Sequence, residues 1–213
     1  MTYGVNAPIG LVPHSYLNGA LWTGQISNYF ITSGYNTATL SVANGGGVFL
    51  NDPIVPQADG SIGLAIAGDA NPVIGSFQGC FYIDSSGNPQ YSKYWPNSTV
   101  TFGSNRAIAY VADTVNLLYD IQYNATPGLD FTALNNNALL VQGNGSTTTG
   151  YSGWSFGTAA AVNATYQLKI IRLTPYIGNL FNSQGPAGVF PYNNFLCLIN
   201  NDPYKGGTGT PGI

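Results

Sequence analysis

Ionised side chains are scarce in this chain of 213 residues, and their scarcity limits what the chain can do. Only 6% of the residues are charged, against about 25% in ordinary soluble domains. The sequence contains no Glu, so every acidic side chain is an Asp. Helical proteins usually cover their exposed faces with Lys, Glu, Arg and Gln. We therefore expect few helices and a polar surface made of Asn, Gln, Ser, Thr and backbone groups.

Basic residues are too few and too scattered for a nucleic-acid partner. The net charge is -3, and the five cations, Lys93, Arg106, Lys169, Arg172 and Lys205, form no run. Sequence-independent binding to phosphates needs clustered Lys and Arg, so we expect no nucleic-acid partner. The sequence also lacks an apolar run of the length, about 18 residues, that a membrane-spanning helix needs. Residues 1–4 do not resemble a signal peptide, and we expect no membrane partner.

Residue types that carry catalysis or bind metals are also few. The chain has one His and two Cys, and Cys80 and Cys197 lie in separate apolar runs that predict buried free thiols. Zinc sites need clustered Cys and His, and no glycine-rich segment has a phosphate-binding context. A Ser/His/Asp arrangement would have to use His14, which we interpret as a surface or interface imidazole. Asp113 and Asp120 remain an alternative pair for glycoside hydrolysis. The sequence predicts no enzymatic activity, metal or cofactor.

The residues that are abundant favour strands and turns. Turn signals recur about every 8–12 residues, which is typical of a sandwich or barrel. We therefore predict an all-β fold, a sandwich or barrel of short antiparallel strands with long loops and at most one or two short helices. The best helix candidate is 131–141. Strands are expected at 29–31, 37–42, 48–50, 54–55, 62–67, 73–83, 90–95, 107–112, 115–123, 166–173 and 195–199.

The two ends of the chain differ from its middle. Residues 1–24 are interrupted by Pro and Gly yet carry many apolar side chains, so we expect an extended N-terminal arm that lies on its own domain or on a neighbour. Residues 25–204 are predicted as the β-rich domain. The Gly-rich stretch 143–153 within it is either a long loop or a boundary between two parts. Residues 205–213, rich in Gly, Thr and Pro, are predicted as an extended tail.

Aromatic residues gather at Tyr91, Tyr94 and Trp95. Such a group could form a platform on which sugar rings stack. We interpret these residues instead as core and interface aromatics, because Tyr and Trp are enriched at protein contacts too, and keep the sugar platform as the alternative. The residues we predict to contact a partner are Tyr3, Ile9, His14, Tyr16, Trp22, Tyr94 and Trp95.

The segments of residues 25–125 follow one another in a characteristic order. An aromatic arm is followed by Tyr29–Gly34, Val48–Val55, the run GLAIAGDA at 63–70 and Pro72–Gly79. The order continues at Tyr94–Pro96, Ala109–Asp113 and Leu118–Gln122. It resembles that of virion structural proteins of tailed bacteriophages, particularly capsid decoration (cement) proteins. The resemblance implies a protein on the outside of the capsid, bound to the major capsid protein and often a dimer or trimer. Its location would be the virion.

Composition and resemblance lead to one principal hypothesis, a structural protein that bridges major capsid subunits. A surface with so few charged residues is poorly soluble by itself, so we expect neighbouring subunits to cover much of it. The alternative is a tail-fibre or receptor-binding module that binds carbohydrate. A major capsid subunit and a hydrolase that uses Asp residues are weaker alternatives.

Overall fold

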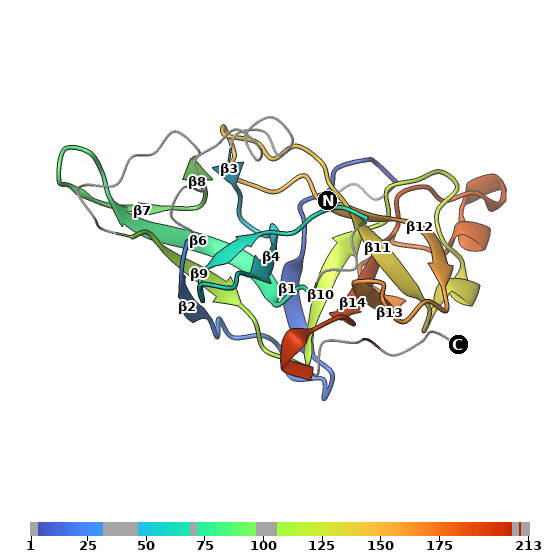
Figure 1. The fold of residues 1–213 in the computed structure, drawn as a ribbon. Helices are drawn as coiled ribbons and strands as arrows, with labels where there is room; N and C mark the ends of the chain where they lie inside the picture. The colour runs from blue at the N-terminus through green and yellow to red at the C-terminus, as the bar shows by residue number, and fades with distance from the viewer. Residues whose placement is uncertain (1–3, 32–46, 69–71, 97–105, 206–208, 210–213) are drawn as a thin grey trace.

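The computed structural model describes residues 4–31, 47–68, 72–96, 106–205 and 209, and these form an all-β protein (Figure 1). Two larger antiparallel sheets pack together in a sandwich-like arrangement, and a two-stranded sheet joins β3 (Gly47–Val48) to β8 (Trp95–Pro96). The described residues contain no α-helix, only four short 3-10 helices: η1 (Phe131–Ala133), η2 (Asn182–Gln184), η3 (Pro186–Gly188) and η4 (Pro203–Lys205). The predicted all-β class is confirmed.

The first sheet has six strands and is built mostly from the C-terminal half of the chain. Strands β10 and β14 are almost continuously buried, so they show no alternation of buried and exposed residues, whereas burial alternates along most of β13. The strand order is β1-β10-β14-β13-β11-β12. The bounds are β1 Val12–Tyr16, β10 Leu117–Gln122, β11 Asn137–Val141, β12 Ser155–Ala161, β13 Leu168–Leu173 and β14 Asn194–Ile199.

The second sheet is built from the N-terminal half. Its order is β2-β9-β6-β4-β5, with β7 paired to the far part of β6. The long strand β6 is bulged between Phe77 and Cys80, where Gly79 has a positive φ of 120°. The bounds are β2 Ser27–Phe30, β4 Pro53–Pro56, β5 Ile62–Leu64, β6 Gly75–Ile83, β7 Pro89–Ser92 and β9 Ile108–Ala112.

Both sheets curl until strands from distant places in their order meet. A parallel bridge joins Ile31, next to β2, to Ile62 in β5. A second parallel bridge joins Tyr123, next to β10, to Phe156 in β12. Curling of this kind leaves fewer unpaired strand edges, which are the parts of a sheet most prone to unwanted pairing.

One hydrophobic core unites the two sheets. The largest fully buried side chains include Phe49 and Phe77 from the N-terminal half and Tyr119, Trp154 and Phe156 from the C-terminal half. The aromatic rings of Phe156 and Phe195 meet edge to face, with centroids 6.0 Å apart, a geometry that aromatic pairs favour.

The helix predicted at 131–141 is wrong. Only Phe131–Ala133 is helical, as η1, and Asn137–Val141 forms β11. The helix ends at its C-cap residue Leu134, whose backbone is extended, and Asn135 follows in a left-handed conformation with a φ of 64°. Pairing of β11 with both β12 and β13 then outweighs the helix propensity of Ala138, Leu139 and Leu140.

Part of the predicted N-terminal arm forms a strand of the first sheet. Residues 12–16 form β1, which pairs with β10 at the end of the first sheet. Pro13 is tolerated there because an end strand has one unpaired side. Tyr3, the predicted strand 37–42 and most of the predicted tail 205–213 lie outside the described residues. The stretch 143–153 connects β11 to β12, two strands that pair with each other, so it is a long loop within one sheet.

Candidate functional site

His14 projects from β1 into a small polar group. Its Nδ1 atom lies 3.1 Å from the hydroxyl oxygen of Ser15, and its ring meets that of Tyr176 edge to face at 6.2 Å. Ser15 is 2% exposed, so substrate has little access to its hydroxyl. No hydrogen bond links His14 to Asp120 among the described contacts. The three residues therefore do not form the nucleophile–base–acid relay considered from the sequence.

Asp120 is held inside the first sheet by neutral donors. The hydroxyl of Thr174 donates to Oδ1 of Asp120 at 2.6 Å, and Nδ2 of Asn194 lies 3.3 Å from both carboxylate oxygens. Burial raises the pKa of Asp120, while these hydrogen bonds and the nearby His14 oppose the rise. A buried carboxyl saturated by protein donors is typical of a structural role.

Buried amide side chains extend this network to the neighbouring loops. Nδ2 of Asn179 donates to the carbonyls of Thr174 and Asn194 at 2.9 and 2.8 Å, and its Oδ1 accepts from the backbone N–H of Asn194 at 3.0 Å. Asn193 binds the backbone of Leu129 with both ends of its amide, at 3.0 and 2.7 Å. Side-chain amides therefore form hydrogen bonds with buried backbone groups at turns, where the backbone hydrogen bonds between strands are interrupted.

Asp113 belongs to a different polar group. It accepts hydrogen bonds from Ser27 at 2.9 Å and from the Tyr29 hydroxyl at 2.6 Å, and that hydroxyl also lies 2.9 Å from the hydroxyl of Tyr204. Burial and the bond to Asp113 raise the pKa of Tyr29. Asp113 and Asp120 share no hydrogen-bond partner among the described contacts, and each is held by side chains of its own neighbourhood. The predicted end of the strand after Ala112 is confirmed.

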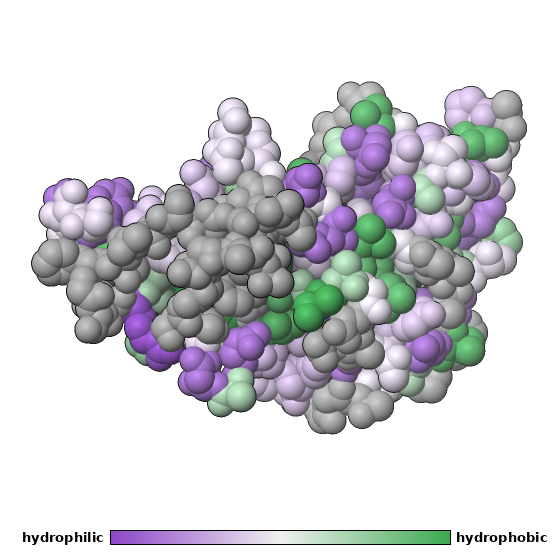
Figure 2. All heavy atoms as spheres, turned by 45° about the horizontal axis from the view of Figure 1, so that its top comes forward, coloured by the Kyte–Doolittle hydropathy of each residue, from purple (hydrophilic) through white to green (hydrophobic). Residues whose placement is uncertain are grey.

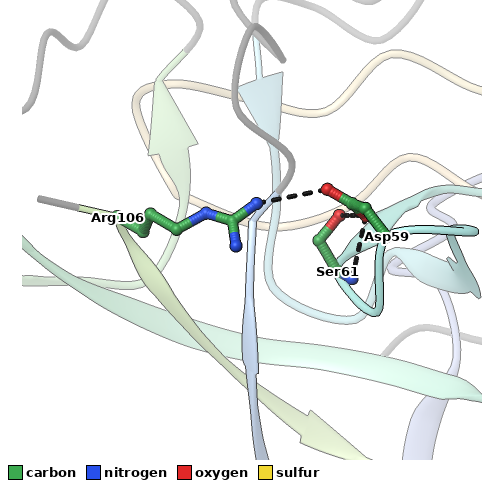
Figure 3. Close-up of polar contacts among 3 residues, drawn as sticks. All are labelled: Asp59, Ser61 and Arg106. Atoms are coloured by element: carbon green, nitrogen blue, oxygen red, sulfur yellow. Dashed lines mark hydrogen bonds and ion pairs between the residues drawn. The ribbon is translucent and has the colours of Figure 1, made fainter. Parts of the chain in front are cut away.

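The ion pair that the structure shows among the described residues is at the surface (Figure 3). Arg106 lies 3.1 Å from Oδ2 of Asp59, and their side chains are 38% and 47% exposed. Ser61 donates to Asp59 through its hydroxyl and its backbone N–H. These hydrogen bonds, and to a lesser extent Arg106, lower the pKa of Asp59. Exposed pairs contribute little to stability.

In the part of the chain that is described, the cysteines form no disulfide and no side chains are grouped as a metal site. Cys80 and Cys197 are buried and free, as predicted. Burial raises the pKa of the Cys80 thiol to about 12, so thiolate is scarce at neutral pH. No group of three or more His, Cys or Asp side chains lies close enough to hold a metal ion within the described ranges.

The aromatic residues 91–95 do not form a common platform. Trp95 is only 7% exposed and meets Tyr82 edge to face at 5.2 Å. The ring of Tyr94 stacks on that of Phe49 with centroids 5.4 Å apart. Tyr91, which lies on β7, is 76% exposed and packs beside Phe81 of the neighbouring strand β6. Trp95 therefore belongs to the core, the second of the two interpretations left open by the sequence, and does not present its ring to a sugar.

Of the other residues predicted to contact a partner, Ile9, His14, Tyr16 and Trp22 are half-buried. Tyr16 and Trp22 stabilise the turn that follows β1. The Tyr16 hydroxyl donates to the side chain of Gln25 at 2.7 Å, and Nε1 of Trp22 donates to the backbone of Gln25 at 3.3 Å. Their rings are partly packed against the core.

The residues just after β1 carry exposed hydrophobic side chains that were not among the individual contact residues predicted from the sequence. In the surface segment, defined as residues 17–30, Leu17, Leu21, Ile26 and Phe30 are 49%, 70%, 45% and 47% exposed. The turn that begins the segment is held by backbone bonds from Tyr16 to Ala20 and from Trp22 to His14. The side chains are thus presented on a defined backbone.

A groove lies between the N-terminal segment, defined as residues 5–10, and the loop 143–153. Its volume is about 450 Å³, and Tyr151, 39% exposed, stands at its side. In Figure 2, where the molecule is turned by 45° from Figure 1 so that its top comes forward, hydrophilic and weakly hydrophobic residues separate small hydrophobic groups. The lining residues are Asn6, Pro8, Ile9, Gly143, Asn144, Ser146, Thr149, Tyr151, Ser152 and Gly153.

Comparisons with known proteins find no matching family model, no similar curated protein and no similar solved structure. Within the described residues, no helix has the length and apolar character needed to cross a membrane.

Proposed function

We propose that this chain is a structural virion protein, a capsid decoration protein that binds the outer shell and bridges major capsid subunits. The observation that carries the proposal is the surface segment 17–30, where four large hydrophobic side chains are 45–70% exposed. Single exposed hydrophobic residues are ordinary, but several on one short segment favour an interaction surface.

The polar groups described above support a structural role. Asp113 and Asp120 accept hydrogen bonds from neutral side chains of their own chain. These bonds fix the strands and loops around each carboxyl. Protein interfaces are depleted in charged residues at their centre and enriched in aromatic ones, which is the composition of this chain as a whole. The resemblance to decoration proteins supplies the partner: the major capsid protein, with further copies of the chain as neighbours.

Geometry also favours docking through the surface segment. β2 is the first strand in the order of its sheet, and its burial alternates, with Asn28 and Phe30 exposed. Arg106 lies over the Phe30 ring at 5.2 Å, which limits the positions that this side chain can take. A surface whose side chains are already restrained loses less conformational entropy when a partner binds.

The experiment is co-sedimentation of purified chain with capsid shells that lack it. We expect saturable binding with a fixed number of copies per shell, weakened at least about tenfold by the double change Leu21→Ser and Phe30→Ser, because two buried hydrophobic contacts are lost. Ile177→Ser is the matched control, since Ile177 is 99% exposed and lies outside the segment. Failure of the unaltered chain to bind shells would contradict the proposal.

A further inference from the structure

We propose that the groove beside Tyr151 binds a neutral saccharide, an activity separate from docking on a shell. The groove is formed by a wall from the N-terminal segment, with Asn6 and Ile9, and a wall from the loop 143–153. Its volume of about 450 Å³ falls in the range of small-molecule sites, roughly 300–1,000 Å³.

The lining has the chemistry that a sugar requires. Among the described residues that line the groove, none is charged, while Asn6, Asn144 and Thr149 are exposed amides and a hydroxyl. Amides and hydroxyls can both donate and accept hydrogen bonds, so they can pair with a sugar hydroxyl whether that hydroxyl donates or accepts. The side-chain amides of Asn6 and Asn144 make no hydrogen bond to another described residue, which leaves their bonding capacity to solvent or a ligand.

Tyr151 adds an aromatic face. Nζ of Lys93 lies 5.3 Å from the centroid of its ring, an arrangement that helps hold the ring in position. The ring remains 39% exposed at the groove. A tyrosine ring is apolar on its faces and carries a polar hydroxyl at one end. It is therefore suited to a sugar, whose ring has an apolar face of C–H groups and hydrated hydroxyl groups at its edge.

Both walls are fixed before any ligand arrives. Leu50 binds the loop through two backbone bonds, to Gly150 at 3.0 Å and to Ser152 at 2.9 Å. On the other side, the amide of Gln122 accepts from the N–H of Ala7 at 2.9 Å and donates to the carbonyl of Val5 at 3.0 Å. A pre-formed site avoids the entropy cost of ordering its walls on binding.

Close packing joins the two walls next to the lining residues Ile9 and Ser152. Gly10 has a φ of 79°, and its N–H donates to the carbonyl of Trp154 at 3.0 Å. A side chain at Gly10 would collide with the backbone of Asn51 and the hydroxyl of Ser152. The shape of the groove therefore depends on a glycine that the N-terminal segment needs for this approach.

The test is binding of the full chain to an array of immobilised neutral and acidic oligosaccharides, followed by titration with the best neutral one. Tyr151→Ala should weaken binding about tenfold through loss of the ring contact. Asn144→Ala should weaken it about three- to tenfold through loss of a hydrogen bond. Tyr91→Ala is the matched control, since Tyr91 is an exposed tyrosine on β7, away from the residues that line the groove.

Binding of neutral sugar that both groove variants weaken and Tyr91→Ala leaves intact would support the proposal. Three results would overturn it: no neutral oligosaccharide bound, acidic oligosaccharides bound alone, or equal loss in the Tyr91 and Tyr151 variants. The variant with Leu21→Ser and Phe30→Ser should keep full sugar binding, which separates this result from that of the shell experiment.

Discussion

Two neighbouring regions of this molecule invert the usual distribution of side chains. Around β10 and β14, the interior holds Asp120, Asn179 and Asn194, each at most 6% exposed. Just after β1, the surface holds Leu21 and Phe30, 70% and 47% exposed. The internal polar groups have hydrogen-bond partners within the chain, whereas the external hydrophobic groups stay largely exposed, even though Arg106 lies over the ring of Phe30. In these two regions, buried polar residues help to hold the fold, and we propose that the exposed hydrophobic ones contact a partner.

The largest effect on stability is expected inside the network, at Asn179. Asn179→Ala removes three hydrogen bonds and leaves the buried backbone N–H of Asn194 without its acceptor. We expect the free energy of unfolding to fall by about 1 to 3 kcal/mol, measured by urea denaturation.

The matched control is Asn28→Ala, because Asn28 is an exposed amide on β2 whose side chain donates to no described residue. Its effect should stay within about 0.5 kcal/mol. An equal loss in the two variants would mean that the buried amides do not hold the loops to β14.

A smaller, pH-dependent effect is expected at Asp120. Burial raises the pKa of this carboxyl in the folded state, so its favourable contribution is present while it is protonated and is lost as pH rises through the folded pKa. The stability advantage of the unaltered chain over Asp120→Asn should therefore be larger at about pH 4 than at about pH 7.

Urea denaturation of both proteins at the two pH values measures this difference, and comparison with Asp120→Asn cancels titrations elsewhere in the chain. An advantage that grows with pH would show that the donors Thr174 and Asn194 outweigh burial and that the carboxylate is the form that the fold favours.

The smallest effect is expected in the surface segment. Leu21→Ser alters a side chain that is 70% exposed, and the free energy of unfolding should change by no more than about 0.5 kcal/mol. Thermal and urea denaturation test this directly. A loss as large as that of Asn179→Ala would place Leu21 among the contacts that hold the fold and remove the basis for assigning it to a partner.

The fold class was predictable because it depends on patterns that are local in sequence. The recurring turns and the alternating residues of 166–173 predict strands, and β13 forms there. Strand β11 was not predictable in the same way, because Ala138 to Leu140 favour a helix locally and only pairing with β12 and β13 decides the outcome.

The candidate sites were harder to predict, since exposure depends on the whole fold. Trp95 was predicted as a residue that contacts a partner but is buried in the core, whereas Tyr151 sits in a stretch of low complexity that gave no signal of its own. Leu21 falls between Gly19 and Gly24, in a segment whose apolar load did predict a contact surface. Which of its side chains face solvent followed only from the pairing of β1 with β10.

Hydrogen–deuterium exchange of the chain, free and bound to capsid shells, tests the central claim most directly. The account predicts slower exchange over residues 17–30 on binding and no change around Ile177, whose side chain is fully accessible. Unchanged exchange over 17–30 in chain that is bound to shells would contradict it, because the exposed leucines and Phe30 would then face solvent in the assembled particle as well.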